Sequence, residues 1–157
     1  MKLSDIIVRD AIVTQLASNE RDKVIAEMLD ALVAAGATPA EFRDHIYQSI
    51  LHRETRGSTA WGKGIAVPHF KHKSMQGLSL AIGLSGHGVE FNALDRQPVY
   101  SVFLLISPED KPEEHLQAME AICTNLSKET FRRFLRQAHT PDDVLTLLDE
   151  ADNQLIR

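Results

Sequence analysis

The chain has 157 residues, enough for one domain with a sizeable core, and its 43% hydrophobic and 25% charged residues are typical of a globular protein. The formal net charge is -5 and no long basic block occurs, which argues against a dedicated nucleic-acid-binding protein. The single cysteine, Cys123, excludes a disulfide within the chain and suits a reducing compartment.

The N-terminal residues carry charges at once and lead into no continuous apolar segment of the kind that a secretory signal contains. No apolar run reaches the ~18 residues that a membrane-spanning helix needs. The chain also lacks internal repeats and a Gly/Ser-rich linker. We therefore expect a single cytoplasmic domain over residues 1–157, without direct membrane insertion.

The first third of the chain is predicted to be helical. Apolar residues recur at helical spacing over residues 24–33, and Gly36 supplies a C-terminal stop. Thr38 is predicted to cap the next helix, with Pro39 at its first position and Glu41 completing a capping box. The buried face of this second helix consists of Phe42, Ile46 and Ile50, and the helix should end before Gly57.

The middle of the chain changes character. Three glycines within residues 57–64 predict a loop, followed by an extended segment over residues 65–69. Pro68 cannot donate to a sheet ladder, so this strand should end there or lie at an edge. Residues 78–84 alternate as in a strand, and residues 99–106 are nearly all apolar, as expected for a central strand covered on both faces.

The last third is predicted to be helical again. One helix opens at Pro112, a second short one covers residues 131–135, and a final one starts at Thr140. Helices at both ends and strands in the middle predict an α/β fold. We expect a mixed sheet of about four to five strands sandwiched between helices, in a single domain.

Two of the seven histidines lie where an anion could bind. His69 follows a proline at the end of the glycine-rich segment, whose backbone N–H groups can approach an anion closely. His115 lies in the first turn of a helix that follows the central strand, and such positions favour negative charge. Taken alone, both residues are equally compatible with ordinary surface or partly exposed histidines.

A metal site is the alternative for the histidine pair formed by His69 and His72. Two histidines three residues apart can bind zinc if the segment is helical, but Pro68 and the glycines argue against a helix here. Walker A, dinucleotide-binding and nucleophile-elbow motifs are missing from the sequence. We therefore expect neither a metal nor a cofactor.

A longer ordered motif surrounds His69. The run R-E-T-R-G-S-T from Arg53 to Thr59 is followed by G-K-G-I-A-V-P-H from Gly62 to His69. It resembles the active-site signature of type-2 enzyme IIA domains, the mannitol/fructose type, of the bacterial phosphoenolpyruvate-dependent sugar phosphotransferase system. The resemblance continues through residues 91–99 and 112–116, and covers essentially the whole chain.

This resemblance implies a phosphotransferase that works through a phosphohistidine. His69 would accept the phosphoryl group at Nε2 from the phosphohistidine of a small histidine-containing phosphocarrier protein. His115 would lie beside it, and Arg53 would help to set the charge around the phosphoryl group. The predicted supporting residues of the phosphate site are Ser58, Thr59 and Gly64.

Within the family, the sequence favours the nitrogen-regulatory branch, whose phosphorylation state controls binding to other proteins. The near alternative is a sugar-specific component that passes the phosphoryl group to a IIB partner. Phe70 stands where many members have glycine, and Trp61 where a smaller residue is expected. With these aromatics beside the site, the sequence does not identify the partner protein. A phosphate-independent binding module is the third hypothesis.

Overall fold

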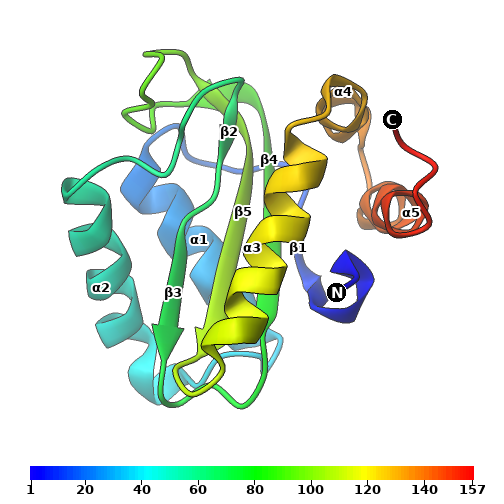
Figure 1. Cartoon of the computed structure of the whole chain (residues 1–157). Helices are drawn as coiled ribbons and strands as arrows, with labels where there is room; N and C mark the ends of the chain where they lie inside the picture. The colour runs from blue at the N-terminus through cyan, green and yellow to red at the C-terminus, as the bar shows by residue number, and fades with distance from the viewer.

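The centre of the fold is one mixed sheet of five strands (Figure 1). The computed structural model describes all 157 residues. Its strands follow the order β1-β4-β5-β2, and β3 also pairs with β5. Only β4 and β5 are antiparallel, and the other pairs are parallel. The strands are β1 (Ile7–Val13), β2 (Ile65–Ala66), β3 (His69–His72), β4 (Ser79–Val89) and β5 (Val99–Pro108).

One edge of the sheet is interrupted at Pro68, between β2 and β3. Ile65 pairs with Ser101 and His69 with Leu105, so both short strands run along the same side of β5. Because proline has no N–H to donate, the ladder breaks at this residue and resumes one residue later. The predicted edge position is confirmed, and the break makes His69 the first residue of a new strand.

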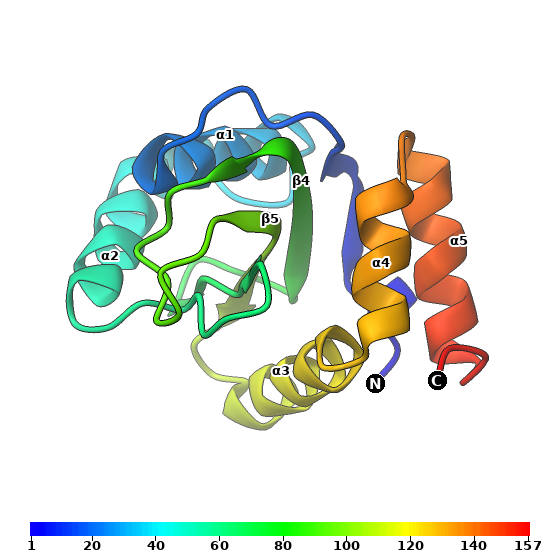
Figure 2. The same cartoon turned by 90° about the horizontal axis from the view of Figure 1, so that it is seen from above.

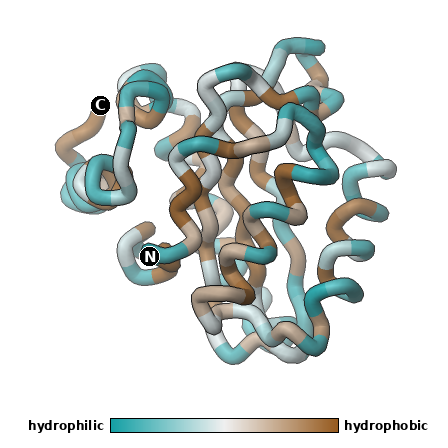
Figure 3. Tube along the Cα trace, turned by 180° about the vertical axis from the view of Figure 1, so that it is seen from behind, coloured by the Kyte–Doolittle hydropathy of each residue, from teal (hydrophilic) through white to brown (hydrophobic).

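Helices cover both faces of the sheet, as predicted. Figure 2 shows α1 (Arg21–Ala34) and α2 (Arg43–Thr55) on one side and the three C-terminal helices on the other. The latter are α3 (Pro112–Leu126), α4 (Glu129–Gln137) and α5 (Pro141–Asp152). Two separate clusters of buried apolar side chains result, one on each face. The hydrophobic colour in Figure 3 accordingly concentrates along the strands between the helices.

The two ends of the chain meet beside β1. A short 3₁₀ helix, Leu3–Asp5, lies against α5, and the backbone N–H groups of Leu3 and Ser4 donate to the Asp152 carboxylate at 2.7 and 3.0 Å. Figures 1 and 2 show the N-terminal segment beside α5. No helix has both the length and the apolar character needed to cross a bilayer.

The prediction of a helical first third is wrong for residues Ile7–Val13, which form β1. Ile7 pairs with Leu80 and Ile12 with Ile82, so four residues of β1 oppose a single residue of β4. This bulge carries the exposed Arg9 and Asp10 and interrupts the alternation by which a strand is recognised.

The predicted capping box at Thr38 is also wrong. The chain passes through a 3₁₀ turn, Ala40–Phe42, and α2 begins only at Arg43. Thr38 is buried, and its hydroxyl has no hydrogen-bond partner. A capping box does form at the start of α5, where Thr140 Oγ1 accepts from the Asp143 backbone N–H.

Candidate functional site

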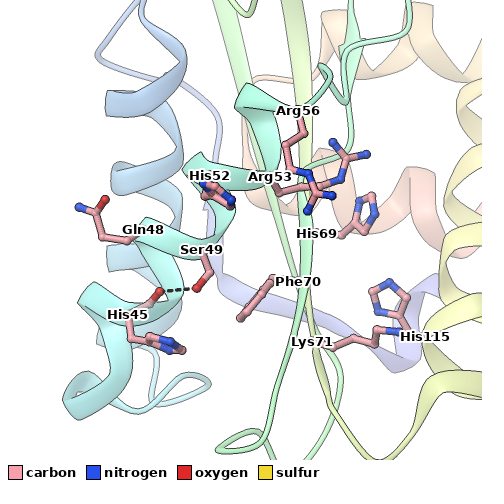
Figure 4. A pocket seen from close by; sticks show the side chains of 10 residues that line it. All are labelled: His45, Gln48, Ser49, His52, Arg53, Arg56, His69, Phe70, Lys71 and His115. Atoms are coloured by element: carbon pink, nitrogen blue, oxygen red, sulfur yellow. Dashed lines mark hydrogen bonds between the residues drawn. The ribbon is translucent and has the colours of Figure 1, made fainter.

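A pocket of about 570 Å³ opens between α2 and the edge strand β3. Three of its ten lining residues are Arg or Lys, four are His, and none is acidic. Such a lining favours an anion. The ten residues, drawn in Figure 4, are His45, Gln48, Ser49, His52, Arg53, Arg56, His69, Phe70, Lys71 and His115.

His69 projects into this pocket from the first position of β3. Its Nδ1 lies 2.7 Å from the carbonyl oxygen of Val67, which can only accept a hydrogen bond. Nδ1 therefore carries the proton, and Nε2 keeps its lone pair. Burial lowers the pKa of His69, an effect that the Val67 bond opposes and Arg53 reinforces. A neutral imidazole with a free Nε2 is a nucleophile near neutral pH.

His115 faces His69 from the first turn of α3, with 5.6 Å between the ring centroids (Figure 4). The side chain is buried, and its Nδ1 lies 2.6 Å from Ser107 Oγ at the end of β5. This bond orients the ring and leaves Nε2 as its free nitrogen. Burial, with a contribution from His69, lowers the pKa of His115 to about 4, so this imidazole is neutral at pH 7.

Two guanidinium groups approach His69 from the C-terminal end of α2 (Figure 4). Arg53 also donates through Nη1 to the carbonyl oxygen of Gly57 at 2.6 Å, which ties it to the turn after the helix. Arg56, the residue that directly follows α2, lies on the same side and is exposed. Together with Lys71 they can neutralise a group with several negative oxygens.

The three predicted supporting residues lie outside the pocket. Ser58 is buried and donates to the Phe91 carbonyl oxygen at 3.2 Å. The backbone N–H of Thr59 donates to the Glu54 carboxylate at 3.0 Å, and the Thr59 hydroxyl bonds the same carboxylate. Gly64 has a φ of +74° and accepts at its carbonyl from two backbone N–H groups of β5. Their support of the site is therefore indirect.

The Thr59–Glu54 contact anchors the end of α2 that carries the arginines. Glu54 is only 2% exposed, so we expect Thr59→Val to destabilise the fold by about 1–3 kcal/mol, because a buried carboxylate oxygen loses its partner. Chemical denaturation measures this change. Thr55→Val, which removes only a bond to the preceding turn at an exposed position, should cost less than about 0.5 kcal/mol. Equal losses in the two variants would contradict the anchoring role.

The sequence predicted His69, His115 and Arg53 as site residues, and the structure brings these three together in one pocket. The sequence assigned no role to Arg56, although this residue directly follows α2 in helical conformation, and its spacing of three residues from Arg53 places both on the same face. Ser107, at the end of a nearly uniform apolar strand, offered no signal of its contact with His115.

His69 and His72 do not form a chelating pair. They lie three residues apart on a strand, so their side chains point to opposite faces. His69 faces His115 of α3, whereas His72 faces His45 of α2.

Residues 5–151 match the family described as "Phosphoenolpyruvate-dependent sugar phosphotransferase system, EIIA 2". The chain belongs to this family. The match covers every residue that lines the pocket of this EIIA domain, including both facing histidines.

Relatives of the EIIA domain fall into sugar-specific and nitrogen-regulatory proteins. The fructose-specific EIIABC component of Bacillus subtilis is 33% identical over 97% of this chain, which spans only 24% of that protein. The fructose-specific EIIA component of Haloferax volcanii is 31% identical over 83% of both chains. The nitrogen regulatory protein of Pseudomonas aeruginosa is 28% identical over 98% of both.

Solved structures of EIIA proteins share the fold. Nitrogen regulatory protein IIA-Ntr from Neisseria meningitidis superposes with a TM-score of 0.84 at 24% identity, covering 93% of this chain and 98% of that one. The mannitol IIA of Escherichia coli gives 0.73 at 22% identity, covering 88% and 96%. The EIIA domain is thus similar to proteins of both groups.

Proposed function

We propose that this EIIA domain is a phosphohistidine carrier that accepts a phosphoryl group on Nε2 of His69. The observation that carries the proposal is the bond from His69 Nδ1 to the Val67 carbonyl oxygen, which leaves Nε2 unprotonated in a pocket without carboxylates. The donor is the phosphohistidine of a histidine-containing phosphocarrier protein. Family membership supports both the reaction class and this donor.

In the transfer, the Nε2 lone pair forms a bond to phosphorus as the donor's N–P bond breaks. The electron pair of that bond stays on the donor's ring, and the proton stays on His69 Nδ1, hydrogen-bonded to the Val67 carbonyl oxygen. Arg53, Arg56 and Lys71 neutralise the phosphoryl oxygens. Phosphoryl transfer depends mainly on such positioning and charge stabilisation, so His115 acts as a neutral supporting group rather than as a second nucleophile.

We assign the carrier a regulatory, nitrogen-related role in the cytoplasm. The near full-length match to a nitrogen regulatory protein supports this assignment, and the single cysteine suits the compartment. The alternative, transfer to a IIB component of a sugar system, is supported by the matches to fructose-specific proteins. Incubating the phosphorylated protein with purified IIB components separates the two, since only the sugar role predicts rapid loss of the phosphoryl group to one of them.

The test of the carrier function is a phosphorylation assay with phosphoenolpyruvate, enzyme I and the histidine-containing carrier, followed by intact-mass measurement. We expect one phosphoryl group per chain that is lost in mild acid, as a phosphohistidine is. A protein that stays unmodified with several competent donors would refute the carrier function and favour a phosphate-independent binding module.

A further inference from the structure

A second histidine pair lies on the other side of β3. The backbone N–H of Ser74 donates to His72 Nδ1 at 3.0 Å, and Ser74 Oγ lies 2.6 Å from the same nitrogen. Because a backbone N–H can only donate, Nδ1 of His72 is unprotonated and Nε2 carries the proton. His72 Nε2 lies 3.1 Å from His45 Nδ1, so His72 donates and His45 accepts. The remaining N–H of His45 is then on Nε2.

The pair connects the two elements that form the phosphate pocket. His72 is three residues after His69 on β3, and His45 is on α2, two turns before Arg53. The contact is shielded from solvent, because His72 is only 4% exposed. The His72 ring centroid lies 5.2 Å from that of Phe42 and 6.1 Å from that of Phe70. The His45–His72 contact therefore helps to set the distance between His69 on β3 and the arginines at the end of α2.

We propose that His45 and His72 are positioning residues that hold the strand of His69 against the arginine-bearing helix, and that they do so only while both imidazoles are neutral. This proposal rests on the carrier function proposed above. It concerns the rate of phosphoryl transfer and its dependence on pH, not the identity of the nucleophile.

Protonation of either ring breaks the arrangement. A proton on His45 Nδ1 would face the N–H of His72, and a proton on His72 Nδ1 would face the N–H of Ser74. Burial, His45 and Lys73 lower the pKa of His72, and Glu109, which follows β5, opposes them. The buried, hydrogen-bonded ring is therefore neutral at pH 7, and acidification releases β3 from α2.

The kinetic test compares two substitutions at the exposed His45. His45→Leu removes the acceptor, and we expect transfer to slow about 10-fold near pH 7.5, because small displacements of reacting groups are costly. His45→Asn restores an acceptor that does not titrate, so it should recover most of this loss and show a smaller decline in rate between about pH 7.5 and pH 5.5. His139→Leu, at an exposed position outside the pocket, should keep the wild-type pH profile.

A second measurement does not depend on phosphorylation. Nitrogen-15 NMR of the histidine side chains should show His72 protonated at Nε2 alone at neutral pH, and the amide signals of Phe70 and Ser74 should shift as the pair titrates. Superimposable pH profiles of wild type and His45→Leu, or a His72 ring protonated at Nδ1, would overturn the proposal. If no donor phosphorylates the protein, the carrier function fails, while the NMR result still decides the histidine pair.

Discussion

Replacing His69 with glutamine should abolish phosphorylation completely. The glutamine amide has no nucleophilic lone pair equivalent to imidazole Nε2. Among the histidines of the pocket, His69 is the one whose Nδ1 faces a carbonyl oxygen, which fixes the lone pair on Nε2. His115 has its Nδ1 on Ser107 and a pKa of about 4, and His45 accepts from His72 through its Nδ1. Intact-mass measurement after incubation with the complete donor system should therefore find only unmodified His69→Gln protein.

Two further variants make this result interpretable. His115→Gln should still reach one phosphoryl group per chain, about 100-fold more slowly, because it loses a neutral group that stabilises the transferring phosphoryl oxygens. His139→Gln, at an exposed position outside the pocket, should behave as wild type. Acid-labile modification of His69→Gln would move the acceptor elsewhere in the pocket and refute the assignment of His69.

Acidification should destabilise the fold, and His115 should contribute more to this effect than any other single residue. Its pKa is lowered from the ordinary 6.5 to about 4 in the folded chain, so the unfolded state binds a proton first. The stabilisation is therefore complete above about pH 6.5 and is lost as the pH falls towards 4. Linkage gives a loss of up to about 3 kcal/mol from this residue. His69 and His72 act with the same sign, since burial lowers both of their pKa values.

Denaturant unfolding of wild type and His115→Gln at several pH values between about 7 and 4 measures this contribution. The wild type should lose up to about 3 kcal/mol more than the variant over that range. His52→Gln, which removes an exposed histidine of α2, should follow the wild type. Parallel curves for wild type and His115→Gln would show that His115 titrates alike in the folded and unfolded chains.

The site residues that the sequence predicted are those marked by signals from their immediate neighbours in the chain. Arg53 and His69 belong to a single ordered motif, and His115 follows a recognisable strand and helix start, so local signals were enough. The central strands were equally visible because β4 and β5 have strong apolar patterns, although both extend beyond the predicted ends, to Val89 and Pro108.

The missed features depend on contacts between distant segments. The bulge in β1 places exposed charges within a strand, and the pairing that stabilises it involves β4, some 70 residues later. The His45–His72 bond joins residues that are 27 positions apart, and neither residue has a neighbour that signals the other. The residues around Thr38 match the capping-box pattern, but the chain forms a 3₁₀ turn there and α2 begins after it.

The group that fixes the tautomer of His69 belongs to the backbone. Val67 contributes its carbonyl oxygen, and every amino acid at position 67 would contribute the same atom. A point mutation can change the size of that side chain, but it cannot delete the acceptor. The choice between the two ring nitrogens is thus protected against mutational drift, whereas the arginines, Ser107 and the His45–His72 pair can each be lost in one step. Sequences of this kind can diverge in partners and rates while the atom that we propose to be phosphorylated stays the same.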